Sequence, residues 1–212
     1  MSEITYYVLD VETTGLTKKL HEITEFSLIR CKDKVNLFKQ VKCDHPETAS
    51  LQALEITKKS MADLYNGVSK KEACESITKF LAEDGGNDMS RCIIGHNVSF
   101  DRRFLQAMFD ECGMDLEVSL WLDTMKMTKQ FIKKAGLRVG LKQHPAALKD
   151  ACELFKTKQT SGQHNAKSDS RNTFYLWEKL KTEMMYIKFI ETHKVTKGQE
   201  SYDFDQSDIE ID

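Results

Sequence analysis

The sequence predicts an α/β domain that contains one mixed, five-stranded sheet flanked by helices. Three strand-like segments come first, as a β-meander, and helical segments then alternate with two further strands. Apolar residues make up 40% of the 212 residues and only two residues are proline, so the chain can bury a substantial core. The expected organisation is one domain at residues 1–195, followed by an acidic tail at residues 196–212.

The five expected strands are short segments rich in apolar and β-branched residues. They cover residues 4–11, 22–31, 34–42, 91–95 and 119–124. The sequence Cys-Lys-Asp-Lys joins the second strand to the third and is typical of a hairpin turn. We therefore expect these two strands to be neighbours in the sheet.

The expected helices are identified by apolar residues three and four positions apart. They cover residues 48–55, 58–65, 70–83, 99–112, the segment from the fifth strand to about 135, 145–156 and about 166–192. Phe100, Phe104 and Met108, for example, give one helix an apolar face. Such faces predict helices that pack against the sheet.

The charge of the chain is unevenly distributed. The net charge is −2, with 31 basic and 33 acidic residues, but residues 200–212 hold six acids and no Lys or Arg. The remainder is mildly basic, which permits nucleic-acid binding without predicting it. The tail is expected to be a disordered, solubilising end; docking on a protein partner, or weak competition with nucleic acid, are the alternatives.

The location of the protein is predicted from what the sequence lacks. No stretch of 18 apolar residues occurs, so no membrane span is expected, and the first residues do not resemble a signal peptide. The six cysteines form no Cys-x-x-Cys pair, which is typical of free thiols in a reducing compartment. We expect an intracellular protein of the cytoplasm, nucleoid or nucleus, and the sequence leaves the oligomeric state open.

Two carboxylates, Asp10 and Glu12, stand where the first strand leaves the core. Side chains at positions i and i+2 of a strand point to the same side, so these acids face one way. They repel each other unless a cation lies between them, and Mg²⁺ or Mn²⁺ prefers such oxygen ligands. The alternative is a pair of solvated acids at an exposed strand end.

Three further polar residues could complete a site. Asp101 is expected in the first turn of a helix after the fourth strand, a junction where α/β proteins expose reactive groups, although it could simply favour the helix dipole. His164 and Asp169 suit a shared site if the histidine lies in a loop and the acid in the following helix. The imidazole could then accept a proton from water.

Three motifs occur in a fixed order along the chain. They are Asp-x-Glu-Thr-Thr-Gly-Leu from residue 10, Gly-His-Asn-x-x-Phe-Asp from residue 95 and His-Asn-Ala-x-x-Asp from residue 164. Together they resemble the signature of the DEDDh branch of the DnaQ-like 3′–5′ exonucleases, the superfamily of the proofreading subunit of bacterial DNA polymerase III. The resemblance extends over roughly residues 4–185 and implies an RNase H-like fold.

The resemblance also implies an active site and a reaction. His164 would be the general base, and two Mg²⁺ or Mn²⁺ ions would be held by Asp10, Glu12, Asp101 and Asp169. Nucleic acid with a free 3′ end would be hydrolysed stepwise to nucleoside 5′-monophosphates, with single-stranded or frayed DNA favoured. Substrate contacts are expected at Thr13, Gly15, Leu16, His96, Asn97 and Phe100, the last of which could equally be a core residue. The alternatives are RNA trimming, cleavage of short oligonucleotides and a catalytically idle nucleic-acid-binding module.

Overall fold

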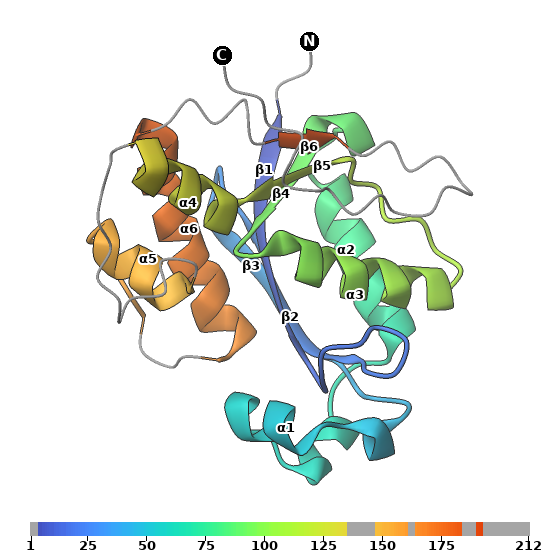
Figure 1. The fold of residues 1–212 in the computed structure, drawn as a ribbon. Helices are drawn as coiled ribbons and strands as arrows, with labels where there is room; N and C mark the ends of the chain where they lie inside the picture. The colour runs from blue at the N-terminus through green and yellow to red at the C-terminus, as the bar shows by residue number, and fades with distance from the viewer. Residues whose placement is uncertain (1–3, 135–146, 161–163, 184–189, 193–212) are drawn as a thin grey trace.

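The computed structural model describes residues 4–134, 147–160, 164–183 and 190–192. Its strands are β1 (Thr5–Thr13), β2 (Ile23–Arg30), β3 (Val35–Gln40), β4 (Arg91–Gly95), β5 (Leu120–Asp123) and β6 (Ile190–Thr192). They form one mixed sheet in the order β3-β2-β1-β4-β5-β6 (Figure 1). The first three strands are antiparallel neighbours, β1, β4 and β5 run parallel, and β6 is antiparallel to β5. All five predicted strands are confirmed, and β6 adds a short edge strand.

The helices of the described residues lie close to the predicted positions. They are α1 (Leu51–Thr57), α2 (Lys70–Ala82), α3 (Val98–Glu111), α4 (Thr124–Lys134), α5 (Leu148–Leu154) and α6 (Ala166–Glu183). Short 3₁₀ turns occur at η1 (Pro46–Thr48), η2 (Met61–Tyr65) and η3 (Asp88–Ser90). The start of α2 shows why the sequence folds this way, because Ser69 and Glu72 form a capping box that satisfies two backbone N–H groups.

Two helix predictions are wrong in part. Residues 58–65 do not form an α-helix, because Lys58 adopts a left-handed conformation that ends α1, and the 3₁₀ turn η2 follows. The last helix does not continue to residue 192, because Ile190–Thr192 pairs with β5 at the edge of the sheet. The β-branched Ile190 and Thr192 favour a strand once a partner edge is present, and helical periodicity alone did not reveal that partner.

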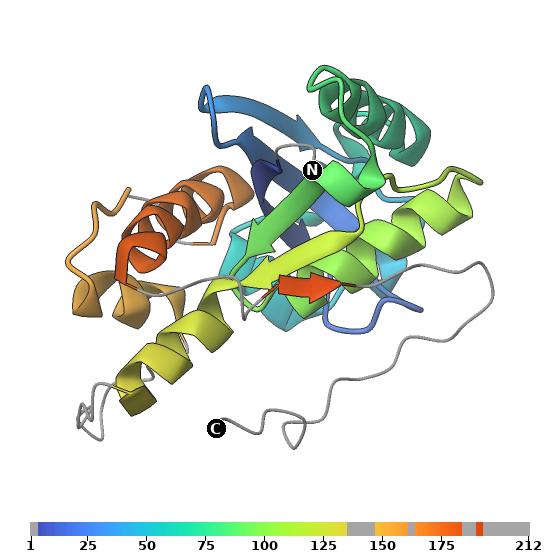
Figure 2. The same ribbon diagram turned by 90° about the horizontal axis from the view of Figure 1, so that it is seen from above.

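The sheet lies between two layers of helices. Helices α2 and α3 cover one face, and α4, α5 and α6 cover the other (Figure 2). Alternate residues of β1 pack into the two cores, since Tyr7 and Leu9 face α2 and α3 whereas Val8 faces α6. The burial of β1 on both faces fixes its register, and this register determines where Asp10 and Glu12 point.

Several remaining predictions concern the chain as a whole. None of the helices in the described part of the chain combines the length and apolarity needed to cross a bilayer. All six cysteines are described and none forms a disulfide. The predicted acidic tail at 196–212 lies outside the described residues.

Candidate metal and active site

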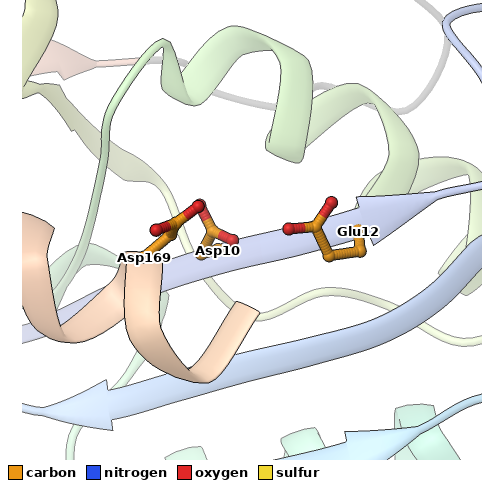
Figure 3. A group of neighbouring side chains, drawn as sticks. All are labelled: Asp10, Glu12 and Asp169. Carbon is orange, nitrogen blue, oxygen red and sulfur yellow. The ribbon is translucent and has the colours of Figure 1, made fainter. Parts of the chain in front are cut away.

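Strand β1 carries two acids on one face near its C-terminal end. Asp10 and Glu12 point toward the first turn of α6, and Asp169 of that turn points back toward them (Figure 3). One carboxylate oxygen of each acid lies within 4.8 Å of the corresponding oxygens of the other two. The structure therefore brings three of the four predicted metal ligands into one cluster.

Asp101 joins the same end of β1 from the first turn of α3. Its side chain is buried, and Oδ1 accepts a hydrogen bond of 3.0 Å from the backbone N–H of Val11. The pairing of β1 with β4 ends at Val8 and Ile94, so β4 does not supply a carbonyl for this N–H group. Asp101 satisfies the donor instead, and its carboxylate is thereby fixed beside the residues that flank Val11.

The turn between β4 and α3 determines the position of Asp101. Asn97 adopts a left-handed conformation (φ 67°) at the start of α3, a conformation that asparagine tolerates better than most residues. Its N–H donates to Oδ1 of Asp123, which also accepts from the N–H of Met125. Asp123 thus connects the ends of two neighbouring parallel strands to the helices that follow them.

The four carboxylates disfavour one another's ionised forms. Burial raises the pKa of Glu12 to about 8, and the charges of Asp169 and Glu25 add to the rise. Burial also raises the pKa values of Asp10, Asp101 and Asp169, and the neighbouring acid Asp101 raises that of Asp10 further. A bound cation would reverse this balance, because it stabilises ionised carboxylates.

His164 lies in a loop before α6, the arrangement under which it can share a site with Asp169. The histidine is exposed and has a left-handed backbone (φ 62°), two residues before α6 begins at Ala166. Its backbone N–H donates to Oδ2 of Asp169 at 3.2 Å. The histidine is therefore held next to the carboxylate cluster through its backbone, at a position that is exposed to solvent.

The loop after Glu12 is tightly folded around Gly15. The buried Thr13 hydroxyl donates to the Gly15 carbonyl at 2.7 Å. A Cβ atom at Gly15 would lie only 2.4 Å from the ring of His21, so a larger residue here would have to displace that side chain. Leu16 follows with 79% of its surface exposed. Substrate contacts by these residues remain a prediction, and Leu16 is the one with a free apolar surface.

The other predicted substrate residues lie at the β4–α3 turn. His96 has its Nδ1 2.9 Å from the Thr124 hydroxyl, which ties this turn to the start of α4. Asn97 is exposed. Phe100 is partly buried and packs against Phe104 with their ring centroids 4.8 Å apart, so its position favours the core role that the sequence left open.

Three residues near the site were not identified from the sequence. Glu25 of β2 is the cross-strand neighbour of Glu12, and Lys59 forms an ion pair with Glu25. Asp123 anchors the β4–α3 turn. The first two could have been found only from the register of the β1–β2 pair, which includes an irregularity after Glu12. Asp123 could have been suspected from its place at a strand end before a helix.

The chemistry of the cluster fits a hard divalent cation. The converging side chains are carboxylates, with no His or Cys ligand among the three that meet within 4.8 Å. Oxygen-only ligand sets are preferred by Mg²⁺ and Mn²⁺, whereas Zn²⁺ commonly takes nitrogen or sulfur ligands. A cation bound at this position would offset the mutual repulsion of the buried acids and so stabilise their ionised forms.

Comparison with known proteins agrees with this geometry. The profile of the RNase T exonuclease family matches residues 7–177, which include the four carboxylates and His164. The chain belongs to this exonuclease family. The predicted membership of the DnaQ-like 3′–5′ exonucleases, with an RNase H-like fold, is thereby confirmed.

The relatives and structural neighbours of this exonuclease family member include a DNA polymerase and two exonucleases in complex with DNA. The PolC-type DNA polymerase III of Staphylococcus haemolyticus is 26% identical over 188 residues, which are 87% of this chain but 12% of the polymerase. The chain thus spans about an eighth of that relative's length. The E. coli exonuclease I–ssDNA complex has a TM-score of 0.70 at 18% identity, over 87% of this chain and 42% of the other. Exonuclease X in complex with 5′ overhanging duplex DNA has a TM-score of 0.60 at 20% identity, over 85% of this chain and 93% of the other.

Proposed function

We propose that this protein is a divalent-metal-dependent 3′–5′ exonuclease that releases nucleoside 5′-monophosphates from nucleic acid. The observation that carries the proposal is the convergence of Asp10, Glu12 and Asp169 at the end of β1, with Asp101 bonded to the same strand. Family membership supplies the reaction class, and the acids supply a place for its metal ions. This cluster also distinguishes the proposal from a catalytically idle module, which would not need it.

The four carboxylates would hold two Mg²⁺ or Mn²⁺ ions. When bound, these ions would lower the pKa of the attacking water and stabilise charge on the leaving oxygen. The protein contributes rigidity: two ligands come from a strand buried on both faces and one from a side chain bonded to that strand. The fourth, Asp169, is positioned by the first turn of α6.

His164 is the proposed general base. A ring nitrogen accepts one proton from the attacking water, whose oxygen forms a bond to phosphorus. The bond from phosphorus to the 3′-oxygen of the preceding nucleotide breaks, and that oxygen takes a proton from solvent. The shortened strand retains a free 3′-hydroxyl, and the released nucleotide carries a 5′-phosphate. The exposed loop position of His164 allows its proton to leave to water between cycles.

DNA with a single-stranded or frayed 3′ end is the proposed substrate. The proposal is supported by the names of the neighbours, which include a complex of exonuclease I with ssDNA and one of exonuclease X with overhanging duplex DNA. The exposed Leu16 offers an apolar surface that any base could stack on, so low sequence specificity is expected. RNA or short oligonucleotides are the alternative substrates.

The test is a comparison of one sequence presented as 3′-labelled single-stranded DNA, duplex DNA and RNA. Purified protein is incubated with each in Mg²⁺ or Mn²⁺, and Asp10→Ala serves as the inactive control. Fastest release of labelled mononucleotide from single-stranded DNA is expected. Faster release from RNA would replace the DNA assignment with the RNA alternative, and no release from any substrate would contradict the exonuclease proposal.

A further inference from the structure

A buried ion pair lies beside the carboxylate cluster, on the neighbouring strand β2. Glu25 of β2 is the cross-strand partner of Glu12, and its Oε2 lies 2.7 Å from Nζ of Lys59. The side chains are only 6% and 11% exposed. Lys59 follows α1, which extends beyond the same end of the sheet at which α6 begins (Figure 1). A lysine from the segment after α1 is thus placed next to the candidate site.

Glu25 also fixes the beginning of α6. Its second oxygen, Oε1, accepts a hydrogen bond of 2.8 Å from the backbone N–H of Ala166. That residue is the first of the helix that carries Asp169, three positions further along. Both oxygens of Glu25 are therefore occupied, one by a helix N-terminus and the other by an ammonium group. Glu25 is consequently engaged before any metal ion binds.

The charges near Glu12 make the position of Lys59 important. Glu25 is the direct cross-strand partner of Glu12, so its carboxylate and the Lys59 ammonium paired with it lie next to the candidate metal ligands. Without Lys59, Glu25 would be a fifth carboxylate at a place that already holds four acids. With Lys59, Glu25 and its partner are neutral as a pair.

We propose that the Glu25–Lys59 pair is a charge-compensating positioning device for the metal centre. Lys59 neutralises Glu25, which frees Glu25 to anchor α6 and leaves the four carboxylates, with a total charge of −4, to match two divalent cations. The inference rests on the proposed function. Neither residue is a catalytic residue, because Glu25 acts through Ala166 and Lys59 acts through Glu25.

Substitutions of the two residues have opposite expected effects on metal affinity. Glu25→Gln keeps an oxygen for the Ala166 N–H but leaves the Lys59 ammonium uncompensated beside the site, so it should repel cations. Lys59→Met removes that ammonium and leaves a negative charge, so it should not weaken cation binding. The double variant is again neutral and still retains the acceptor for α6. A role in packing alone would instead make the double variant at least as impaired as either single variant.

The experiment measures the dissociation constant for Mn²⁺ by isothermal titration calorimetry, without nucleic acid, on the full chain. Glu25→Gln is expected to weaken binding at least tenfold, Lys59→Met to bind as tightly as the parent or more tightly, and the double variant to return within threefold of the parent. The control is Glu22→Gln, since Glu22 is also buried and paired at 2.6 Å to a lysine, Lys70 of α2, and α2 covers the face of the sheet opposite α6. It should stay within threefold of the parent.

Four results would overturn the inference, three of them seen in the glutamine variants and one in Lys59→Met. Glu25→Gln could bind Mn²⁺ within threefold of the parent, the double variant could bind as weakly as Glu25→Gln, or Glu22→Gln could weaken binding as much as Glu25→Gln. Thermal melting in EDTA verifies that each variant is folded. If Glu25→Gln does not fold, Lys59→Met gives an independent test. A tenfold loss of Mn²⁺ affinity in Lys59→Met also contradicts the proposal. Absence of nuclease activity in the parent would refute the proposed function but would leave these binding comparisons valid.

Discussion

Replacing Glu12 by glutamine should stabilise the metal-free protein at high pH. An acid whose pKa is raised by folding holds its proton more tightly in the folded state, so folding is penalised as pH rises from the ordinary value toward the raised one. For Glu12 this window runs from 4.5 to about 8. Glutamine carries no charge at any pH in this range, so the variant avoids the penalty.

The size of the effect follows from the same values. A rise in pKa from 4.5 to about 8 corresponds to about 5 kcal/mol at most, at about 1.36 kcal/mol per pKa unit. Solvent reaches part of the Glu12 side chain and screens its charge, so we expect about 2 kcal/mol. For a chain of this length, 2 kcal/mol corresponds to a melting temperature higher by about 4–8 °C.

The assay is thermal melting in EDTA at pH 5 and pH 9, for the parent and the Glu12→Gln variant. The variant should melt higher at pH 9, and the difference should shrink toward zero at pH 5. Glu55→Gln, on an exposed position of α1, is the control and should change the melting temperature little at either pH. A Glu12→Gln variant that is less stable than the parent at pH 9, or a stability difference that does not depend on pH, would show that folding does not raise the pKa of Glu12.

Further predictions concern catalysis, the backbone and the tail. His164→Ala should lower turnover by about 10²–10⁴ with Mn²⁺ affinity nearly unchanged, as measured by single-turnover kinetics and calorimetry; turnover within twofold of the parent would show that the histidine is not the base. Lys58→Gly should stabilise the protein by about 0.5–1 kcal/mol in urea unfolding, because glycine relieves the left-handed backbone at the end of α1, and a loss of stability would contradict this reading. Deletion of residues 200–212 should lower the Michaelis constant for oligonucleotides at low salt if the tail competes with nucleic acid for a basic surface. Kinetics of the full-length and shortened proteins that are the same at each of two salt concentrations would exclude that competition.

The fold could be predicted from the sequence to the extent that its elements are local. The strand β1 is a run of apolar residues ending in acids, and α3 has a regular apolar stripe, so both were found close to their observed bounds. The edge strand β6 could not be found, because three residues carry no periodicity and acquire a strand conformation only by pairing with β5. Lys58 likewise ends α1 with a backbone conformation that its residue type does not favour.

The candidate site was predictable where its residues lie within motifs. Asp10 and Glu12 share a face because strand geometry requires it, and His164 and Asp169 were expected to share a site only if the histidine lay in a loop, as it does. Glu25 and Lys59 were missed because they meet only through the register of the β1–β2 hairpin and the path of the chain after α1. The sequence therefore predicted the acids that attract a metal, but not the ion pair beside them.

The most direct measurement is a time course of digestion of a 5′-labelled single-stranded DNA by the parent protein in Mn²⁺, with product sizes resolved to one nucleotide. We expect a ladder that shortens one nucleotide at a time from the 3′ end, release of nucleoside 5′-monophosphates, and no ladder with EDTA or with Asp10→Ala. Intact DNA after incubation with folded parent protein, or internal fragments that precede the ladder, would contradict this expectation.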